Sequence, residues 1–521
     1  MAKRGLNIFN SIKLAGVPSS SFDLSHDKKY TFDMGELVPT CCLEVIPGDR
    51  FDISIVNFLR FTPLVAPVMH KIKVTTDFYF VPNRILWDEW DKWITTDNDV
   101  AEAPYIQLSS FVLLQGTIAD YMGLPVGAYE SQRVNALPFA AYFKIYDEFY
   151  RDQNLQNEEF IPLIAGDNAA YAGKINNEPL HRAWMHDYFT AALPFAQKGD
   201  VVQLPLTIAD NQVVEYQNNA GTTDAGILRN TSGTILTTGT VTAGTGPSPL
   251  TGSMQVGGNP AAYDPNGTLV VDVQSDAVDI NTVRRAFRLQ EWLERLARGG
   301  SRYKETILSM FGVNSSDARL QRPEFIGRNV QNMVISEVLS SAETLDSEDA
   351  TVNPVGQMAG HGISAGGDFN GSYYAEEHGW IIGLVSVQPD TTYQDGLHKK
   401  FTRFDRLDYA WPLFANIGEQ EVLNSEVHAF HNDPEGIFGY VPRYAEYKFE
   451  NSTVAGEFRE QLNFWTFGRR LDTDVALNDS FIQCRPPVDP FAVQIGDKVL
   501  AHTMHSIRVR RKLPKFGVPT I

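Results

Sequence analysis

The stretch HKIKVTTDFYFVP, residues 70–82, carries the clearest secondary-structure pattern in the chain. Its residues alternate between two faces at a period of two, which is typical of a β-strand with one face in a core. The residues of the inward face are Ile72, Val74, Thr76, Phe78 and Phe80. Pro82 lacks a backbone donor and is expected to end the strand.

Similar strand patterns occur near both ends of the chain. Residues 41–58 read as two short strands about a Pro47-Gly48-Asp49 turn, and residues 380–390 form a buried β run that Pro389 closes. Residues 497–511 alternate again. Long segments rich in Pro and Gly separate these strands, so we expect a mainly β antiparallel sandwich whose connections greatly outweigh its strands.

Helices are expected at three places. Residues 279–300 carry an apolar stripe at helical spacing, with Asn281 or Thr282 as the N-cap and Gly299 as the stop. The opposite face is rich in arginine, but interleaved glutamates favour solvated ion pairs over DNA contact there. Shorter, aromatic-rich helices are predicted at 135–150 and 178–189, and such patches usually fill a core or an interface.

Composition limits the class of protein. The chain has 521 residues, 43% of them hydrophobic, and no apolar run long enough for a membrane span, so we expect a soluble protein without membrane insertion. The N-terminus lacks the apolar core of a secretory signal. Cys41, Cys42 and Cys484 cannot build a disulfide framework and indicate a reducing compartment. We therefore expect folding in the cytoplasm.

Net charge argues against a general nucleic-acid wrapper, because the chain carries −19 while phosphate binding needs Lys and Arg. The C-terminal region is locally different. Its basic residues are Lys498, Arg508, Arg510, Arg511, Lys512 and Lys515. A solvated basic tail is the simpler interpretation. Contact with a polyanion is the alternative.

No motif requires an enzyme, a metal or a cofactor. GISAG at 362–366 matches the G-x-S-x-G pattern, but its Gly-rich flanks fit neither the strand nor the helix of a nucleophile elbow. His428 and His431 with nearby acids match no ligand scheme, and neither do His181 and His186. The acidic cluster at 343–349 lacks an organising calcium loop. We therefore predict no catalytic residue and no metal or cofactor site.

Residues 221–270 are rich in Thr and Gly and nearly free of charge and aromatics. From composition alone this tract is either a linker between two domains or a loop extending from one. True disorder normally carries more charge.

Seven segments resemble, in order, the major capsid protein of microviruses of the gokushovirus type. They include EVIPGDRF at 44–51 and LARGGSRYKETI at 296–307. The remaining segments are 20–40, 66–90, 311–327, 378–397 and 439–459. The order of seven segments over nearly the whole chain is far more specific than any single motif above.

The resemblance implies an eight-stranded antiparallel viral jelly roll with long loop insertions, formed by residues 1–521 as a single domain. Sixty copies, built from pentamers, would close a T=1 icosahedral shell around circular single-stranded DNA. Residues 200–280 would be an insertion that rises as a three-fold surface protrusion and meets the host cell. Candidate residues of this protrusion are Thr222, Thr231, Thr238, Thr245 and Tyr263.

The resemblance also implies partners: a small basic DNA-associated protein, a minor or pilot virion protein, a scaffolding protein during assembly and a host surface receptor. Because each subunit is acidic, we expect an inner wall that is locally basic. The candidates for contact with DNA are Lys3, Arg4, Arg508, Arg510, Arg511, Lys512 and Lys515. The protein would reside in the virion after assembly in the host cytoplasm.

The alternative reading from the residues alone is a β-sandwich carbohydrate-binding protein. In that reading Trp87, Trp90 and Trp93 would stack on sugars. Their spacing of three equally suits a helix face that packs on a core.

Overall fold

The structure is a computed structural model that describes residues 18–95, 102–200, 202, 280–339 and 358–516. It also describes the strand segments 215–216, 229–230, 255–256, 259–262, 269–270, 344–345 and 351–353. The chain divides into two compact units: unit 1 comprises Met1–Lys198 and Glu294–Ile521, and unit 2 comprises Gly199–Leu293.

Eight strands of unit 1 form a jelly-roll sandwich. They are β2 (His26–Phe32), β3 (Val38–Val45), β4 (Arg50–Phe61), β5 (Ile72–Pro82), β13 (Glu324–Asn332), β17 (Met358–Tyr374), β18 (Gly379–Pro389) and β21 (Val499–Arg511). One sheet has the order β2-β21-β4-β17 and the other β3-β18-β5-β13, with every pairing antiparallel. The predicted fold class is confirmed.

Two short strands extend the first sheet, which we call the open sheet. β1 (Ser20–Asp23) pairs with the end of β21, and β14 (Val334–Leu339) pairs with β17. Strands from both ends of the chain thus lie side by side in one sheet. We call the second sheet, β3-β18-β5-β13, the covered sheet.

The core between the sheets follows from strand alternation. In β4, alternate residues from Phe51 to Phe61 are buried while their neighbours are half-buried or exposed. Phe51 and Ile53 of β4 cluster with Phe78 and Phe80 of β5. The strand predicted from residues 70–82 and its inward face are therefore confirmed.

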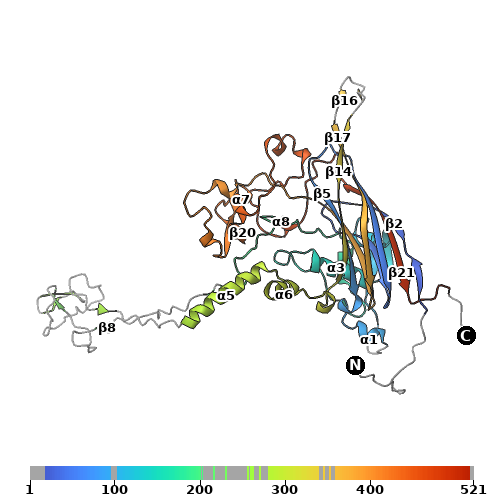
Figure 1. The fold of residues 1–521 in the computed structure, drawn as a ribbon, viewed down its shortest axis with the longest axis horizontal. Coiled ribbons are helices and arrows are strands. Elements are labelled where there is room, and N and C mark those ends of the chain that lie inside the picture. The colour runs from blue at the N-terminus through green and yellow to red at the C-terminus, as the bar shows by residue number, and fades with distance from the viewer. Residues whose placement is uncertain are drawn as a thin grey trace, which may run out of the picture. The chain divides into compact units, whose positions relative to one another are not determined.

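The connection between β5 and β13 buries the outer face of the covered sheet over β18 and the second half of β5, while β13 keeps exposed side chains such as Phe325 and Val330. Its main helix, α3 (Leu137–Phe149), places Tyr142 and Phe143 in one apolar cluster with Tyr79 and Ile382 of the sheet. In Figure 1, α3 lies on the side of the sandwich away from β2 and β21. Because of this layer, β5 is buried on both faces at Asp77 and Tyr79, which simple alternation does not predict.

The other elements of this connection that belong to unit 1 are short. They are η1 (Asn83–Ile85), α1 (Trp90–Ile94), β6 (Tyr105–Leu113), α2 (Ile118–Tyr121), β7 (Gly127–Asn135), α4 (Ala170–Ile175), α6 (Tyr303–Phe311) and η2 (Ala318–Leu320). The strand segments of unit 2 are β8 (Glu215–Tyr216), β9 (Arg229–Asn230), β10 (Gln255–Val256), β11 (Asn259–Ala262) and β12 (Leu269–Val270). Helix α5 (Ile280–Arg298) begins in unit 2 and ends in unit 1.

A second long connection, between β18 and β21, spans residues 390–498 and is called the 390–498 insertion. It contains η3 (Lys399–Phe401), η4 (Pro412–Phe414), β19 (Glu419–Leu423), α7 (Asn424–Val427), β20 (Ile437–Pro442), η5 (Ala445–Tyr447), η6 (Gly456–Arg459), η7 (Asn463–Trp465) and α8 (Asp479–Ile482). The segments β15 (Thr344–Leu345) and β16 (Thr351–Asn353) pair between β14 and β17.

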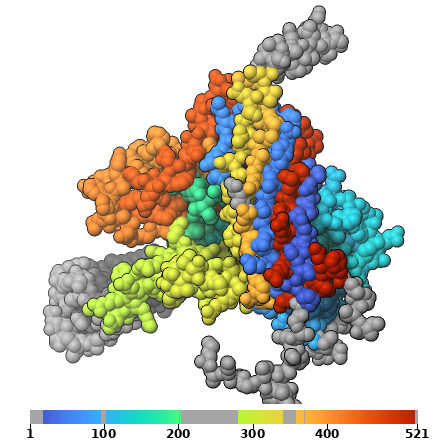
Figure 2. All heavy atoms as spheres, turned by 45° about the vertical axis from the view of Figure 1, so that its right-hand side comes forward, coloured from blue at the N-terminus to red at the C-terminus, as the bar shows by residue number. Residues whose placement is uncertain are grey.

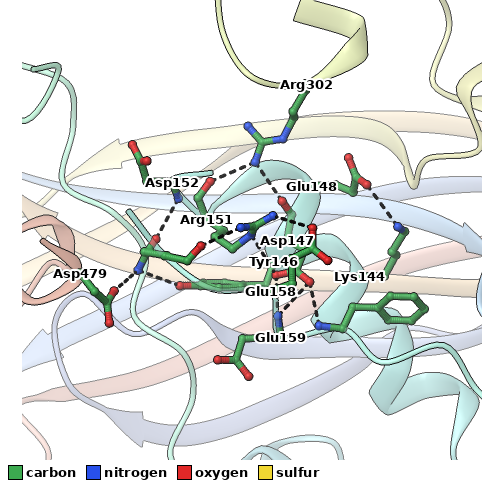
Figure 3. A network of polar contacts seen from close by, with 12 residues as sticks. Lys144, Tyr146, Asp147, Glu148, Arg151, Asp152, Glu158, Glu159, Arg302 and Asp479 are labelled. Carbon is green, nitrogen blue, oxygen red and sulfur yellow. Dashed lines mark hydrogen bonds and ion pairs between the residues drawn. The ribbon is translucent and has the colours of Figure 1, made fainter. Parts of the chain in front are cut away.

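Polar contacts hold the connection between β5 and β13 together and join it to the 390–498 insertion (Figure 3). Arg302, just before α6, donates to the backbone oxygens of Asp147 and Arg151 at 2.9 and 3.0 Å. Gln156 donates to the carboxylate of Asp479 in α8 at 2.8 Å. These contacts hold the two connections against each other within unit 1.

The helix predictions are confirmed at two of three places. α3 occupies the predicted 135–150 region, and α5 ends before Gly299 as expected but begins at Ile280, ahead of the predicted cap. The helix predicted at 178–189 is wrong. That segment is extended, since it makes isolated bridges to Glu36 and Gln483 through His181 and Ala183.

The two strands predicted within 41–58 exist, as the end of β3 and most of β4. They do not pair with each other, because the Pro47-Gly48-Asp49 turn carries the chain from the covered sheet to the open sheet. Gly48 adopts a φ of 90°, a left-handed conformation that favours glycine.

Candidate nucleic-acid interface

The outer face of the open sheet is uncovered in unit 1 (Figure 2). Alternate residues of β4 and β21 are exposed along it, whereas α3 buries the corresponding face of the covered sheet. The exposed basic residues of this face are Lys29, Arg50, Arg60, Arg508 and Arg510, and the exposed acidic ones are Asp23, Asp27 and Asp52.

Arg510 and Arg50 stand directly opposite each other in the register of β21 and β4. Both side chains are exposed, and neither forms an ion pair with any residue that the structure describes. Arg510 donates through Nε to the hydroxyl of Ser19 at 3.2 Å. Like charges directly opposite each other in a sheet are destabilising. The pair is therefore suited to an anion that neutralises both guanidinium groups.

An aromatic residue completes this row. Tyr374 of β17 stands opposite Arg50 on the other side and is 57% exposed. Arginine binds phosphate bidentately, and exposed aromatic rings stack on the bases of single strands. The row Arg510, Arg50 and Tyr374 therefore combines the two contacts that single-stranded nucleic acid requires.

Arg508, the next outward residue of β21, lies between two acids. It is in register with Asp23 of β1 and Asp52 of β4. Hydrogen bonds from Ser25 lower the pKa of Asp23, and the charge of Arg508 acts in the same direction. Because its neighbours are acidic, Arg508 offers less positive potential to a ligand than Arg510.

Arg511 lies on the opposite face of the strand, where other groups of the protein already bind its guanidinium. Its Nε lies 2.9 Å from Oδ2 of Asp49, which is fully buried, and its Nη2 donates to the carbonyl of Glu44. Asp49 also accepts from the backbone of Ile46 at 3.2 Å. Arg511 thus fixes the turn that carries the chain between the two sheets.

The remaining candidates differ in exposure. Lys512 and Lys515 are exposed beyond the end of β21, and Lys512 packs close to Gly48, where an added Cβ would lie 2.7 Å from its Cε. Lys498 is buried and donates to the carbonyl of Gln494 at 3.1 Å. Lys3 and Arg4 lie outside the described residues, as do the protrusion candidates Thr222, Thr231, Thr238, Thr245 and Tyr263.

Sequence reasoning missed Arg50 and Tyr374. Arg50 had a usable signal, because the alternation of β4 puts it on the face opposite Phe51. Its position beside Arg510, however, depends on a pairing between strands at opposite ends of the chain.

A cavity of about 950 Å³ adjoins another part of the open sheet and has mixed charge. Lys28 and Arg60 line it together with Asp33, Glu36 and Asp497. Burial raises the pKa of Glu36 to about 8 and lowers that of Lys28 to about 8. With acids among its walls, this cavity is a poor phosphate site compared with the Arg50 and Arg510 row.

The motifs set aside in the sequence have structural roles. Ser364 of GISAG lies within strand β17, is 2% exposed and donates to the carbonyl of Asn332 at 3.0 Å. His428 and His431 accept hydrogen bonds from the backbone of Phe430 and Asp433. Among the described residues, no group of His, Cys, Asp and Glu is arranged to hold a metal ion. The cluster at 343–349 lies largely outside them, with only residues 344–345 described.

The three tryptophans form a cluster against the core. Trp87 is 1% exposed, and its ring lies 6.5 Å from that of Trp90 and 5.9 Å from that of Trp93. Trp87 therefore cannot stack on a sugar, and the partly exposed Trp90 and Trp93 pack against the same core cluster. Within the described part of the chain, no helix has the length and apolarity to cross a bilayer.

Comparison with known proteins identifies the relatives of this chain. The profile of a family described as "Capsid protein (F protein)" matches residues 10–521. Capsid protein VP1 of Chlamydia phage 1 is 33% identical over 98% of this chain and 97% of its own length. Capsid protein VP1 of Bdellovibrio phage phiMH2K is 34% identical over 92% and 91%. Capsid protein VP1 of Spiroplasma virus 4 is 30% identical over 88% and 86%.

Proposed function

We propose, since the chain belongs to the family of phage capsid proteins described as the F protein, that sixty copies of it form a T=1 icosahedral shell around circular single-stranded DNA. Membership in this family establishes the general role of the protein. It is a structural component of the virion, a homo-oligomeric capsid subunit and no enzyme. The resemblance to microvirus capsid proteins read from the sequence is likewise confirmed.

The proposal that the protein contacts DNA rests on the open sheet. Its outer face is uncovered in unit 1, while the opposite side of the sandwich is buried under α3. Arg50 and Arg510 form an unpaired cationic row there, beside exposed Tyr374. We infer that this face lines the shell interior, with Lys512 and Lys515 extending it and Arg508 contributing weakly. Arg511 supports the site by holding the turn at Asp49.

Neutralising the arginine row tests this assignment. The variant Arg50→Gln with Arg510→Gln should package less DNA, because two charge-assisted phosphate contacts are removed. The slope of log K against log salt for binding of single-stranded DNA should shrink in magnitude by about 1.4, since each contact contributes about 0.7. DNA content is measured as the nucleic acid to protein ratio of purified particles.

The control is Arg319→Gln with Arg459→Gln, two exposed arginines of η2 and η6 that lie outside the open sheet. This variant loses the same charge and should keep wild-type DNA content. Equal DNA content in both variants would contradict the proposed inner face.

We also propose that the Thr- and Gly-rich tract forms a surface protrusion at the three-fold axes. The tract lies between β5 and β13, which pair directly, and this pairing supports an insertion within one sandwich. Thr favours exposed strands and Gly allows tight turns, while low charge lets three copies approach each other. Host attachment is the role we assign to it.

Deleting residues 221–270 tests the protrusion. We expect shells to form at near wild-type yield, because β5 still pairs with β13 without the tract. Adsorption of particles to host cells should fall at least tenfold. A variant with a short Gly-Ser bridge controls for strain at the junction, and failure of both variants to fold would count against an insertion.

Partners follow from the same proposal. The subunit is acidic, with a net charge of −19, so enclosed DNA needs more cations than the arginine row supplies. We therefore propose a small basic DNA-associated protein, together with a minor or pilot protein and a scaffolding protein. Assembly is proposed to occur in the host cytoplasm.

A further inference from the structure

The 390–498 insertion presents an apolar surface on the segment 397–417. Phe404 is 90% exposed and Leu413 is 85% exposed, whereas such side chains normally lie inside a fold. Five more large apolar residues of the segment are about half exposed or more: Phe401, Leu407, Tyr409, Trp411 and Ile417. We call these seven residues the 397–417 surface.

This segment is held in place by polar contacts. The backbone amides of Phe404 and Asp405 both donate to Oδ2 of Asp408 at 2.8 Å. Arg403 pairs with Glu446 at 3.1 Å, and its guanidinium lies 4.2 Å from the ring centre of Tyr447.

Further contacts fix the second half of the segment. The amide of Ala410 donates to the hydroxyl of Tyr447 at 3.3 Å, and that of Trp411 donates to the hydroxyl of Tyr444 at 3.2 Å. The indole of Trp411 donates to the carbonyl of Arg406 at 2.8 Å. The fold therefore supports the apolar side chains in an outward position instead of burying them.

The size of the surface suits a stable protein interface. A fully exposed large side chain has an area of roughly 200 Å². Summed over the seven residues, the exposed fractions correspond to an exposed area on the order of 900 Å². One side of a standard interface buries about 800 Å², so the exposed apolar area of this segment is enough for one.

We propose that the 397–417 surface is a contact between copies of this chain. This inference rests on the capsid role, because a shell covers apolar surface on each subunit with its neighbours. Its area matches what one partner contributes to a stable interface.

The first experiment compares two double variants in cells that produce particles. Phe404→Asp with Leu413→Asp should lower the fraction of the chain that sediments as particles at least tenfold. The subunit itself should keep its thermal midpoint, since both residues are exposed. The matched control, Phe404→Leu with Leu413→Met, retains apolar surface and should assemble within twofold of wild type.

The second experiment does not depend on an assembly defect. In Phe404→Cys, the new thiol should react with a maleimide at least tenfold more slowly in shells than in unassembled subunits. Burial raises the pKa of Cys42 and Cys484 to about 12, so the native thiols contribute little background. Denatured particles give the full reactivity as a control.

The outcomes separate this inference from the capsid role. Wild-type chain that never sediments as particles would overturn the capsid role itself. Normal shells from the Asp variant, with equal thiol reactivity in shells and subunits, would overturn only the inference. Normal shells that fail to adsorb to host cells would assign the surface to a host partner and also overturn it.

Discussion

Arg469→Leu should lower the free energy of unfolding of the subunit by about 3 kcal/mol and release the 390–498 insertion. Arg469 is 8% exposed, donates to the carbonyl of Phe481 at 2.7 Å and lies 4.2 Å from the ring centre of that residue. Its Nη1 also lies 3.3 Å from the hydroxyl of Tyr393, which donates to buried Asp187 at 2.7 Å. Removing the guanidinium leaves the buried carbonyl of Phe481 without this donor and removes the positive charge beside the Tyr393–Asp187 pair.

Unfolding of the unassembled variant by urea, with limited proteolysis of residues 390–498, measures the effect. Arg470→Leu is the matched control, because Arg470 pairs with Asp489 at 3.2 Å and both side chains are 41% exposed. Exposed pairs contribute about 0–1 kcal/mol. Equal loss of stability in both variants would show that burial of Arg469 is not what anchors the insertion.

Arg328→Met should cost about 3 kcal/mol and weaken the pairing of β5 with β13. The guanidinium of Arg328 binds both oxygens of Asp77 at 2.6 and 2.9 Å, and Tyr150 donates to the same carboxylate at 2.6 Å. Asp77 is 1% exposed, so its charge is left buried when Arg328 is removed. The Arg328 side chain is 46% exposed, so solvent screens part of its attraction to Asp77 and limits the loss.

A double-mutant cycle isolates this interaction. Adding Asp77→Asn to Arg328→Met removes the uncompensated charge, while the amide oxygen can still accept from Tyr150. We expect the double variant to recover more than half of the lost stability in the same urea experiment. A double variant less stable than Arg328→Met would contradict a role for the charge of Asp77.

The strands of the sandwich could be predicted because their signal is local. Residues 70–82 alternate at a period of two, and β5 occupies Ile72–Pro82. The burial of Asp77 and Tyr79 could not be predicted, because it depends on packing against α3, which lies far along the chain in the connection between β5 and β13. The helix wrongly predicted at 178–189 has the same cause, namely contacts with residues far away in the sequence. Its partners Glu36 and Gln483 are remote in sequence and hold the segment extended.

The candidate site, like the fold, could be predicted from the sequence only in part. The basic run near the C-terminus is visible in the sequence, and alternation along β21 separates outward Arg508 and Arg510 from Arg511. Arg50 joins the site only through the pairing of β4 with β21, which the sequence does not encode locally. Arg511 looks equally available in the sequence, yet buried Asp49 engages it.

The most direct test is electron microscopy of genome-filled particles at a resolution that places side chains. We expect the open sheet to face the lumen, with nucleic-acid density against Arg50, Arg510 and Tyr374. An open sheet on the particle exterior, or a lumen-facing sheet with no density near these residues, would contradict the assignment of this face to DNA.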